Sequence, residues 1–196
     1  MSEERKTRPG ETAGEAAPAG TADLPTSPEA LEARLTELGI AFKTVSHPPL
    51  YTVEQAKALR GSLPGAHIKN LFLRNKKGAM WLVVCLEDRA VDLKALADAL
   101  DAGRFSFGSA ERLMTHLGVQ PGAVTPFAAI NDMAGVVTVV LDAALVGAPL
   151  VNCHPLVNDR TTALSAADLV RFLEAVGHPP TILEMDGLGA GEPIRT

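Results

Sequence analysis

Two apolar runs separated by a four-residue turn constrain the fold of this chain more than any other feature. The first run is HIKNLFLR, residues 67–74, and the second is AMWLVVCL, residues 79–86. The intervening NKKG is polar and ends in glycine, which is typical of the turn between two antiparallel strands. We therefore predict a β-hairpin against which the rest of the chain must pack.

Helical patterns and further short strands flank the hairpin. Ser27 caps a helix that begins at Pro28 and ends at Gly39. Capping residues and apolar stripes predict further helices at residues 52–61, 92–100, 109–117 and 165–177. Extended segments are predicted at residues 40–45, 136–141, 150–154 and 181–184. This mixture indicates a mixed α/β, or α+β, fold with a central mixed β-sheet flanked by helices.

The chain is expected to form one domain with two tails. Its 196 residues and 46% hydrophobic content are enough for one substantial core. Residues 1–26 are rich in Ala, Gly, Pro, Thr and Glu and lack aromatic residues, which predicts a disordered tail. The domain is expected to span residues 27–186, and residues 187–196 are expected to form a C-terminal tail.

The composition predicts a soluble protein of the cytoplasm. The first residues lack the apolar centre of a secretory signal. The most apolar tract, residues 133–151, is interrupted by Thr138, Asp142, Gly and Pro, so it is expected to form core elements and not a membrane span. Cys85 and Cys153 are too few for a disulfide framework or a four-thiolate zinc site, which fits a reducing compartment.

Charge is distributed unevenly along the chain, whose net charge is −5. Residues 43–77 carry seven basic side chains against the single acid Glu54, whereas residues 78–186 carry six basic and thirteen acidic side chains. A basic face on an acidic body can steer a polyanion to one side. Lysines in solvated surface turns would give the same pattern, so the charges alone do not establish a nucleic-acid site.

Lys69 and Asn70 are the first candidate site residues. Strand alternation places Lys69 on the same face as Leu71 and Leu73, so a cation lies beside an apolar surface. Its ammonium can either reach a phosphate or ribose in a cleft or extend into solvent at the strand end. Asn70 is expected on the opposite face or at the start of the strand, where its amide can act as a donor or only cap a turn.

The segment GVQPGAVTPF, residues 118–127, is the second candidate. Pro121 and Pro126 stiffen it, and the donors between them are the backbone amides of residues 122–125. Such a loop can present amides to a carbonyl oxygen or an oxyanion. It can equally be a rigid connection between a helix and a strand.

His154 is the third candidate, because it lies where a strand is expected to end before Pro155. It can face a cleft, or its ring can simply be satisfied by backbone contacts. Cys153 beside it suggests a thiol nucleophile, but neighbouring strand residues point to opposite faces, so Cys153 is predicted to be a small buried residue. No histidine spacing predicts a metal site, and no Walker A or Gly-x-Gly-x-x-Gly motif predicts a nucleotide cofactor.

These separate signals combine into a family pattern. The blocks AHIKNLFLRNKKG, VDLKAL, FSFGSAERL, LGVQPGAVTPFAAIND, NCHPLVNDRTTALS and DLVRFLEAVGHPP follow one another along the chain. Together they resemble the free-standing prolyl-tRNA editing proteins, and most closely the branch that acts on alanyl-tRNA(Pro). That branch is related to the editing domain of bacterial prolyl-tRNA synthetases and to the YbaK-type cysteinyl-tRNA(Pro) deacylases. The resemblance covers about Ser27 to about Asp186 and implies a single YbaK-like editing domain.

The resemblance also implies roles for individual residues. Lys69, Gly122 and His154 take the catalytic positions, with Lys69 near the 3′ end of the tRNA and Gly122 opening the GxxxP loop that positions the aminoacyl carbonyl and the terminal adenosine. The implied substrate-binding residues are Asn70, Ala123, Val124, Thr125, Pro126 and Asn158. Ala123 departs from the family, where serine is common, and this matters only if a side chain at that position takes part in recognition.

The implied reaction is ester hydrolysis by water without a covalent protein intermediate, helped by a ribose hydroxyl of the terminal adenosine. The implied partner is tRNA(Pro) charged with alanine, with prolyl-tRNA synthetase or an elongation factor as a further candidate, and with neither a metal nor a cofactor nor a membrane. Two alternatives stay open. One is a deacylase for Cys-tRNA(Pro) or another small amino acid, and the other is a non-catalytic tRNA-binding or synthetase-partner module.

Overall fold

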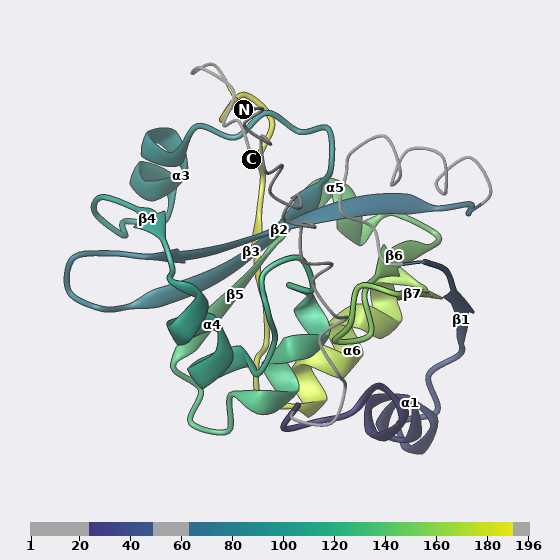
Figure 1. The fold of residues 1–196 in the computed structure, drawn as a ribbon. Helices are drawn as coiled ribbons and strands as arrows, with labels where there is room; N and C mark the ends of the chain where they lie inside the picture. The colour runs from purple at the N-terminus through teal and green to yellow at the C-terminus, as the bar shows by residue number, and fades with distance from the viewer. Residues whose placement is uncertain (1–23, 49–62, 190–196) are drawn as a thin grey trace, which may run out of the picture.

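The computed structural model describes residues 24–48 and 63–189, which fold around one mixed β-sheet (Figure 1). The strands are β1 (Phe42–Ser46), β2 (Ala66–Arg74), β3 (Met80–Leu86), β4 (Ser106–Phe107), β5 (Val137–Asp142), β6 (Val151–Cys153), β7 (Arg160–Leu164) and β8 (Thr181–Leu183). Their order is β1-β7-β6-β2-β3-β5-β8, with β4 also paired to β2. The pairs β6–β2, β3–β5 and β5–β8 are parallel and the others are antiparallel. The predicted central mixed sheet is therefore confirmed.

The predicted hairpin forms the centre of this sheet. β2 and β3 are antiparallel, and their register runs from Ile68 opposite Leu86 to Arg74 opposite Met80. Asn75 holds the turn between them, because its side-chain oxygen accepts hydrogen bonds from the backbone amides of Lys77 and Ala79 at 3.0 and 3.1 Å. The turn is thus fixed by an asparagine side chain as well as by the backbone.

Helices cover the two faces of the sheet. They are α1 (Pro28–Glu37), α3 (Leu93–Ala99), α4 (Ala110–Leu117), the 3₁₀ helix η2 (Pro126–Asn131), α5 (Ala143–Val146) and α6 (Ala166–Ala175). The predicted caps are present: the side chains of Ser27, Ser109 and Ser165 each accept a hydrogen bond from an amide in the first turn that follows. The helix predicted at residues 52–61 lies outside the described residues.

Four short elements were not predicted from the sequence: β4, η2, α5 and β7. Each has six residues or fewer, as do several strands that were predicted, so length alone does not explain the omission. β7 forms because it pairs with β1 and β6, which are distant partners that a local pattern does not reveal. The GxxxP loop, considered only as a connection or an amide loop, continues directly into η2 at Pro126.

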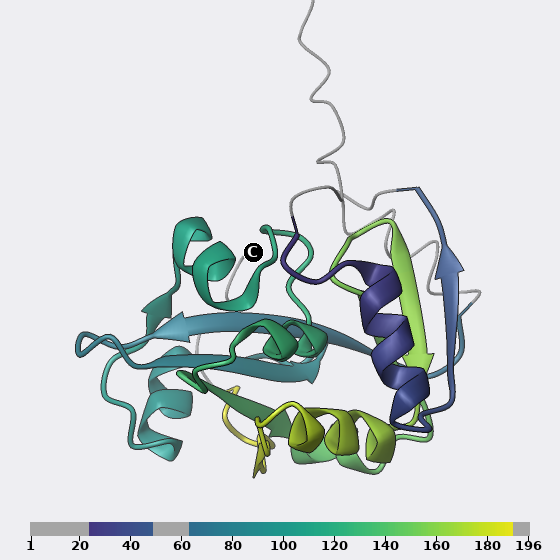
Figure 2. The same ribbon diagram turned by 90° about the horizontal axis from the view of Figure 1, so that it is seen from below.

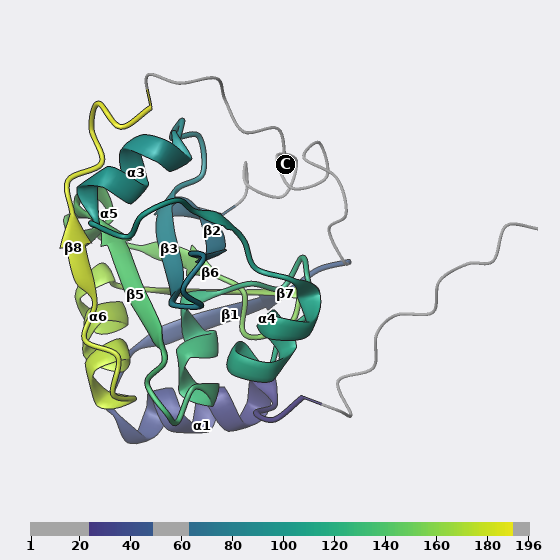
Figure 3. The same cartoon turned by 90° about the vertical axis from the view of Figure 1, so that its left-hand side faces the viewer.

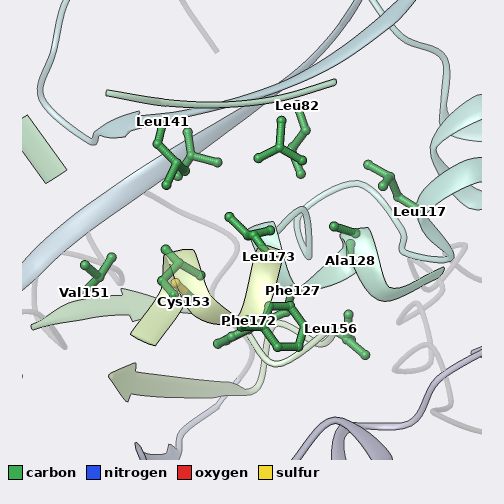
Figure 4. Close-up of a cluster of buried hydrophobic side chains, with 14 of the residues drawn as sticks. Leu82, Leu117, Phe127, Ala128, Leu141, Val151, Cys153, Leu156, Phe172 and Leu173 are labelled. Carbon is green, nitrogen blue, oxygen red and sulfur yellow. The ribbon is translucent and has the colours of Figure 1, made fainter. Parts of the chain in front are cut away.

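The sheet separates two apolar clusters. The larger cluster lies on the side covered by α1, α4, α6 and η2, all of which lie on one side of β2 and β3 (Figures 2 and 3). Leu82, Leu141 and Val151 of the sheet meet Phe127 and Phe172 of the helices there (Figure 4), and the two phenylalanine rings pack edge to face with centroids 5.2 Å apart. This packing fixes η2, and with it the end of the loop that precedes it.

The smaller cluster lies on the other face, under α3. It includes Leu71 and Leu73 of β2, Leu96 of α3, and Met185 beyond β8. Residues 187–189, which were assigned to the C-terminal tail, contact this region: Leu188 packs against the cluster and its carbonyl accepts a hydrogen bond from the Asp92 amide at 3.0 Å.

Candidate active site

Strand β2 presents Lys69 and Asn70 to opposite faces of the sheet. Lys69 lies on the face of Leu71 and Leu73, as alternation predicted, and both leucines are buried in the smaller cluster. Asn70 lies on the other face of the sheet, together with Phe72, which belongs to the larger cluster. Two adjacent residues of one strand therefore serve two separate regions.

Asn70 contacts the GxxxP loop. Its side-chain amide donates a hydrogen bond to the carbonyl oxygen of Val124 at 2.8 Å. No cis peptide bond occurs among the described residues, so the N–H of the next residue, Thr125, points away from the bound carbonyl. Asn70 thus fixes the orientation of the Val124–Thr125 peptide.

The loop offers backbone donors. The Ala123 amide closes a turn onto the Gln120 carbonyl at 3.0 Å, so it is already used. Within residues 24–48 and 63–189, the amides of Gly122, Val124 and Thr125 have no hydrogen-bond acceptor. The buried Thr125 hydroxyl accepts a hydrogen bond from a following amide of η2 at 3.4 Å, which anchors the end of the loop. Gly122 is exposed and Val124 is partly exposed, whereas Thr125 is fully buried, so the loop can present the amides of Gly122 and Val124 to an external oxygen atom.

Gly122 lies beside Asn158. The backbone of Gly122 has φ +89°, a conformation that favours glycine, and a Cβ placed there would lie 3.9 Å from Asn158 Nδ2. The GxxxP loop and the HPLVN segment of residues 154–158, which are separate in the sequence, are therefore neighbours. Leu156 of the same segment is fully buried with φ +68°, so its side chain anchors the turn between His154 and Asn158 in the larger cluster.

His154 is held by a backbone contact, with one ring nitrogen left over. Its Nδ1 lies 3.0 Å from the Arg160 carbonyl oxygen. A carbonyl can only accept, so Nδ1 carries the hydrogen and Nε2 of the neutral ring is an acceptor. Burial lowers the pKa of His154, and the nearby His47 lowers it further, against the raising effect of the Arg160 contact. His154 is accordingly neutral near pH 7.

The His154 ring should titrate below its ordinary value of 6.5. Because its folded-state pKa is depressed, the folded protein should lose stability as the pH falls below the unfolded-state value, where the unfolded chain takes up the proton first. An NMR titration of the His154 ring protons measures this. A midpoint at or above the ordinary value of 6.5 would contradict the assigned environment.

His47 was not among the site residues predicted from the sequence. Its ring lies 6.4 Å from that of His154, centroid to centroid. Its Nε2 lies 3.0 Å from Thr161 Oγ1, and its backbone amide donates to the Asp159 carbonyl at 2.9 Å. The contact with Thr161 joins positions far apart in the chain, so no local spacing could have indicated it.

Lys69 does not lie with the other predicted residues. Its ammonium donates a hydrogen bond to the carbonyl of Arg89, in the turn after β3. Cys85 is its cross-strand neighbour, and burial raises the pKa of that thiol to about 11. The structure thus brings together Asn70, Gly122–Pro126 and the segment 154–158, and places Lys69 on the other face of β2.

Cys153 is buried in the larger cluster, as predicted (Figure 4). Its side chain is 2% exposed, and burial strongly raises its pKa, so the thiol is protonated at neutral pH. A thiol without thiolate character and without access to solvent is a poor nucleophile.

The basic residues between positions 43 and 77 do not gather on one face, as far as the structure describes them. Lys43 lies on β1 at one edge of the sheet, whereas Lys76 and Lys77 lie in the β2–β3 turn, which extends to the opposite side (Figure 1). Among the described residues, no group of three or more His, Cys, Asp or Glu side chains could hold a metal ion. The helices of the described residues include none that is long and apolar enough to cross a membrane.

Known proteins resemble this chain over most of its length. The family model of the aminoacyl-tRNA editing domain matches residues 47–172. The prolyl-tRNA editing protein ProX of Acetoanaerobium sticklandii is 38% identical over 158 residues, covering 80% of this chain and 96% of that protein. The prolyl-tRNA synthetase associated domain-containing protein 1 of Bos taurus is 40% identical over 162 residues, covering 80% and 94%. A solved structure of a candidate trans-editing enzyme for prolyl-tRNA synthetase shares the fold, with TM-score 0.63, 19% identity, and coverage of 80% and 94%.

Proposed function

The chain belongs to the aminoacyl-tRNA editing domain family, and we propose that it hydrolyses the ester bond of alanine mischarged onto tRNA(Pro) in the cytoplasm. Membership of this family makes the protein an aminoacyl-tRNA deacylase. The observation that carries the proposal is the loop 122–126, in which the amides of Gly122 and Val124 are accessible and unused, and which is oriented by Asn70 and adjoins Asn158.

The loop supplies what ester hydrolysis requires. When water attacks the aminoacyl carbonyl carbon, negative charge develops on the carbonyl oxygen, and fixed backbone amides stabilise that charge. The new bond joins the water oxygen to the carbon, and the bond from that carbon to the ribose oxygen breaks. The proton from water goes to the departing ribose oxygen. The products are free alanine and uncharged tRNA(Pro).

Asn70 and His154 act as positioning residues in this proposal. Asn70 holds the Val124 carbonyl, which fixes the loop that carries the Gly122 and Val124 amides. His154 is neutral and has its Nε2 lone pair available, so it accepts a hydrogen bond from the aminoacyl group. The adjacent His47 and Asn158 complete the polar side of the site.

We propose that specificity for alanine comes from steric exclusion of larger side chains. A pocket that excludes a larger side chain by steric clash discriminates strongly, whereas preferring alanine over glycine gains only about 1–3 kcal/mol per methylene. We therefore expect proline and cysteine to be excluded more effectively than glycine.

Hydrolysis should not depend on a cysteine nucleophile. Cys153→Ala should retain deacylation of Ala-tRNA(Pro) and lose some stability, because the thiol is buried in the core. His154→Ala should impair deacylation without unfolding the protein. Release of labelled alanine by both variants, with circular dichroism as the folding control, tests this proposal. An inactive but folded Cys153→Ala beside an active His154→Ala would contradict it.

A further inference from the structure

A buried carboxylate lies outside the machinery described above. Asp142, at the end of β5, is fully inaccessible to solvent. One of its oxygens caps α5 by accepting a hydrogen bond from the Ala144 amide at 3.0 Å. The other forms an ion pair with Nε of Arg89. A buried carboxylate of this kind is retained only with a fixed cationic partner.

Arg89 connects this carboxylate to Lys69. Its guanidinium is held by Asp142 on the inside and by Asp186 at 2.7 Å on the outside, where the Asp186 side chain is 79% exposed. Its backbone carbonyl accepts the hydrogen bond from the Lys69 ammonium. One residue therefore links the buried charge to the predicted catalytic lysine.

Packing alone does not hold the turn that carries this carbonyl. Two backbone hydrogen bonds hold the turn, from the Glu87 amide to the His67 carbonyl at 3.0 Å and from the Arg89 amide to the Leu86 carbonyl at 3.1 Å. Beside it lies a hollow of about 460 Å³, lined by Leu86, Asp88, Arg89, Ala90, Met185, Gly187 and Gly189. The ion pair on the inner side adds to these bonds, because it holds the Arg89 side chain and with it the residue that carries the carbonyl.

We propose that the Asp142–Arg89 ion pair positions the Lys69 ammonium by fixing the carbonyl to which it is bound. Asp142 and Arg89 are positioning residues that act through Lys69, and the expected effect on turnover rests on the proposed deacylase function and on the catalytic role that the family resemblance implies for Lys69. Loss of the pair should release the ammonium from its fixed place while leaving the side chain present.

The test compares Asp142→Asn with Asp186→Asn. Asparagine keeps an oxygen for the α5 cap and leaves Arg89 paired with Asp186, so the fold should survive. Competitive acetylation with trace acetic anhydride reports the accessibility of Lys69, with Lys76 and Lys77 in the exposed turn as internal references. We expect Asp142→Asn to label Lys69 faster and to lower kcat about 10- to 100-fold, as misplacement of a positioning group does. Asp186→Asn should change neither quantity.

A double-mutant cycle distinguishes positioning from a general structural defect. In a Lys69→Ala background, Asp142→Asn should cause no further loss of turnover, because its effect passes through the lysine. An equal loss in both backgrounds, or unchanged labelling of Lys69 in folded Asp142→Asn, would overturn the proposal. If Asp142→Asn fails to fold, Arg89→Met combined with Asp142→Leu removes both charges, and the same labelling applies. Faster labelling with normal turnover by Lys69→Ala would support the positioning and remove Lys69 from the deacylation mechanism.

Discussion

Lys69→Ala should lower the rate of Ala-tRNA(Pro) deacylation by about 100-fold or more, the size of effect seen on removing one fixed polar group of an active site, because the family resemblance places this lysine near the 3′ end of the tRNA. The ammonium makes one hydrogen bond to a backbone carbonyl, and the side chain is only partly buried, so the fold should tolerate the change. Single-turnover release of alanine, measured beside circular dichroism, determines both effects.

Lys77→Ala is the matched control for this experiment. Lys77 lies in the exposed β2–β3 turn, so Lys77→Ala removes the same charge from the same hairpin but outside the site. Its turnover should stay close to wild type. Wild-type turnover by a folded Lys69→Ala protein would show that the lysine does not serve the reaction.

Arg89→Ala should lower the free energy of unfolding by about 3–5 kcal/mol, which is typical of removing one partner of a buried ion pair. The change leaves the Asp142 carboxylate fully buried without its cation. Asp142→Asn should cost less, because Arg89 keeps its contact with Asp186 and is itself partly accessible. Urea denaturation of the two variants measures the difference.

Asp186→Asn serves as the control for this stability series as well, since it removes an exposed partner of the same arginine. Exposed ion pairs contribute about 0–1 kcal/mol to stability, so the urea midpoint of Asp186→Asn should stay close to that of the wild type. A similar loss of unfolding free energy for Arg89→Ala and Asp186→Asn would mean that the buried Asp142 carboxylate does not need Arg89 as its cationic partner.

Features set by neighbouring residues could be predicted from the sequence. Serine caps at positions 27, 109 and 165 marked the starts of three helices, because a cap and its amide lie within one turn. Alternation along β2 placed Lys69 with Leu71 and separated it from Asn70. The burial of Cys153 followed from the same reasoning.

Contacts between distant segments could not be predicted in this way. The hydrogen bond from Asn70 to Val124 and the contact of His47 with Thr161 each join residues that only the folded sheet brings together. The ion pair of Arg89 with Asp142 depends equally on the parallel pairing of β3 with β5. Residue types and their spacing identified candidates, whereas their grouping required the fold.

A deacylation panel determines whether this chain removes alanine from tRNA(Pro). Purified protein is mixed with tRNA(Pro) charged separately with alanine, cysteine, serine or proline, and amino-acid release is compared with the spontaneous rate in buffer. We predict rapid release of alanine, slower release of serine, and release of cysteine and proline close to the buffer rate. Faster release of cysteine than of alanine would assign the chain to the other deacylase branch. Release of all four amino acids at the buffer rate would show that the chain does not deacylate tRNA(Pro).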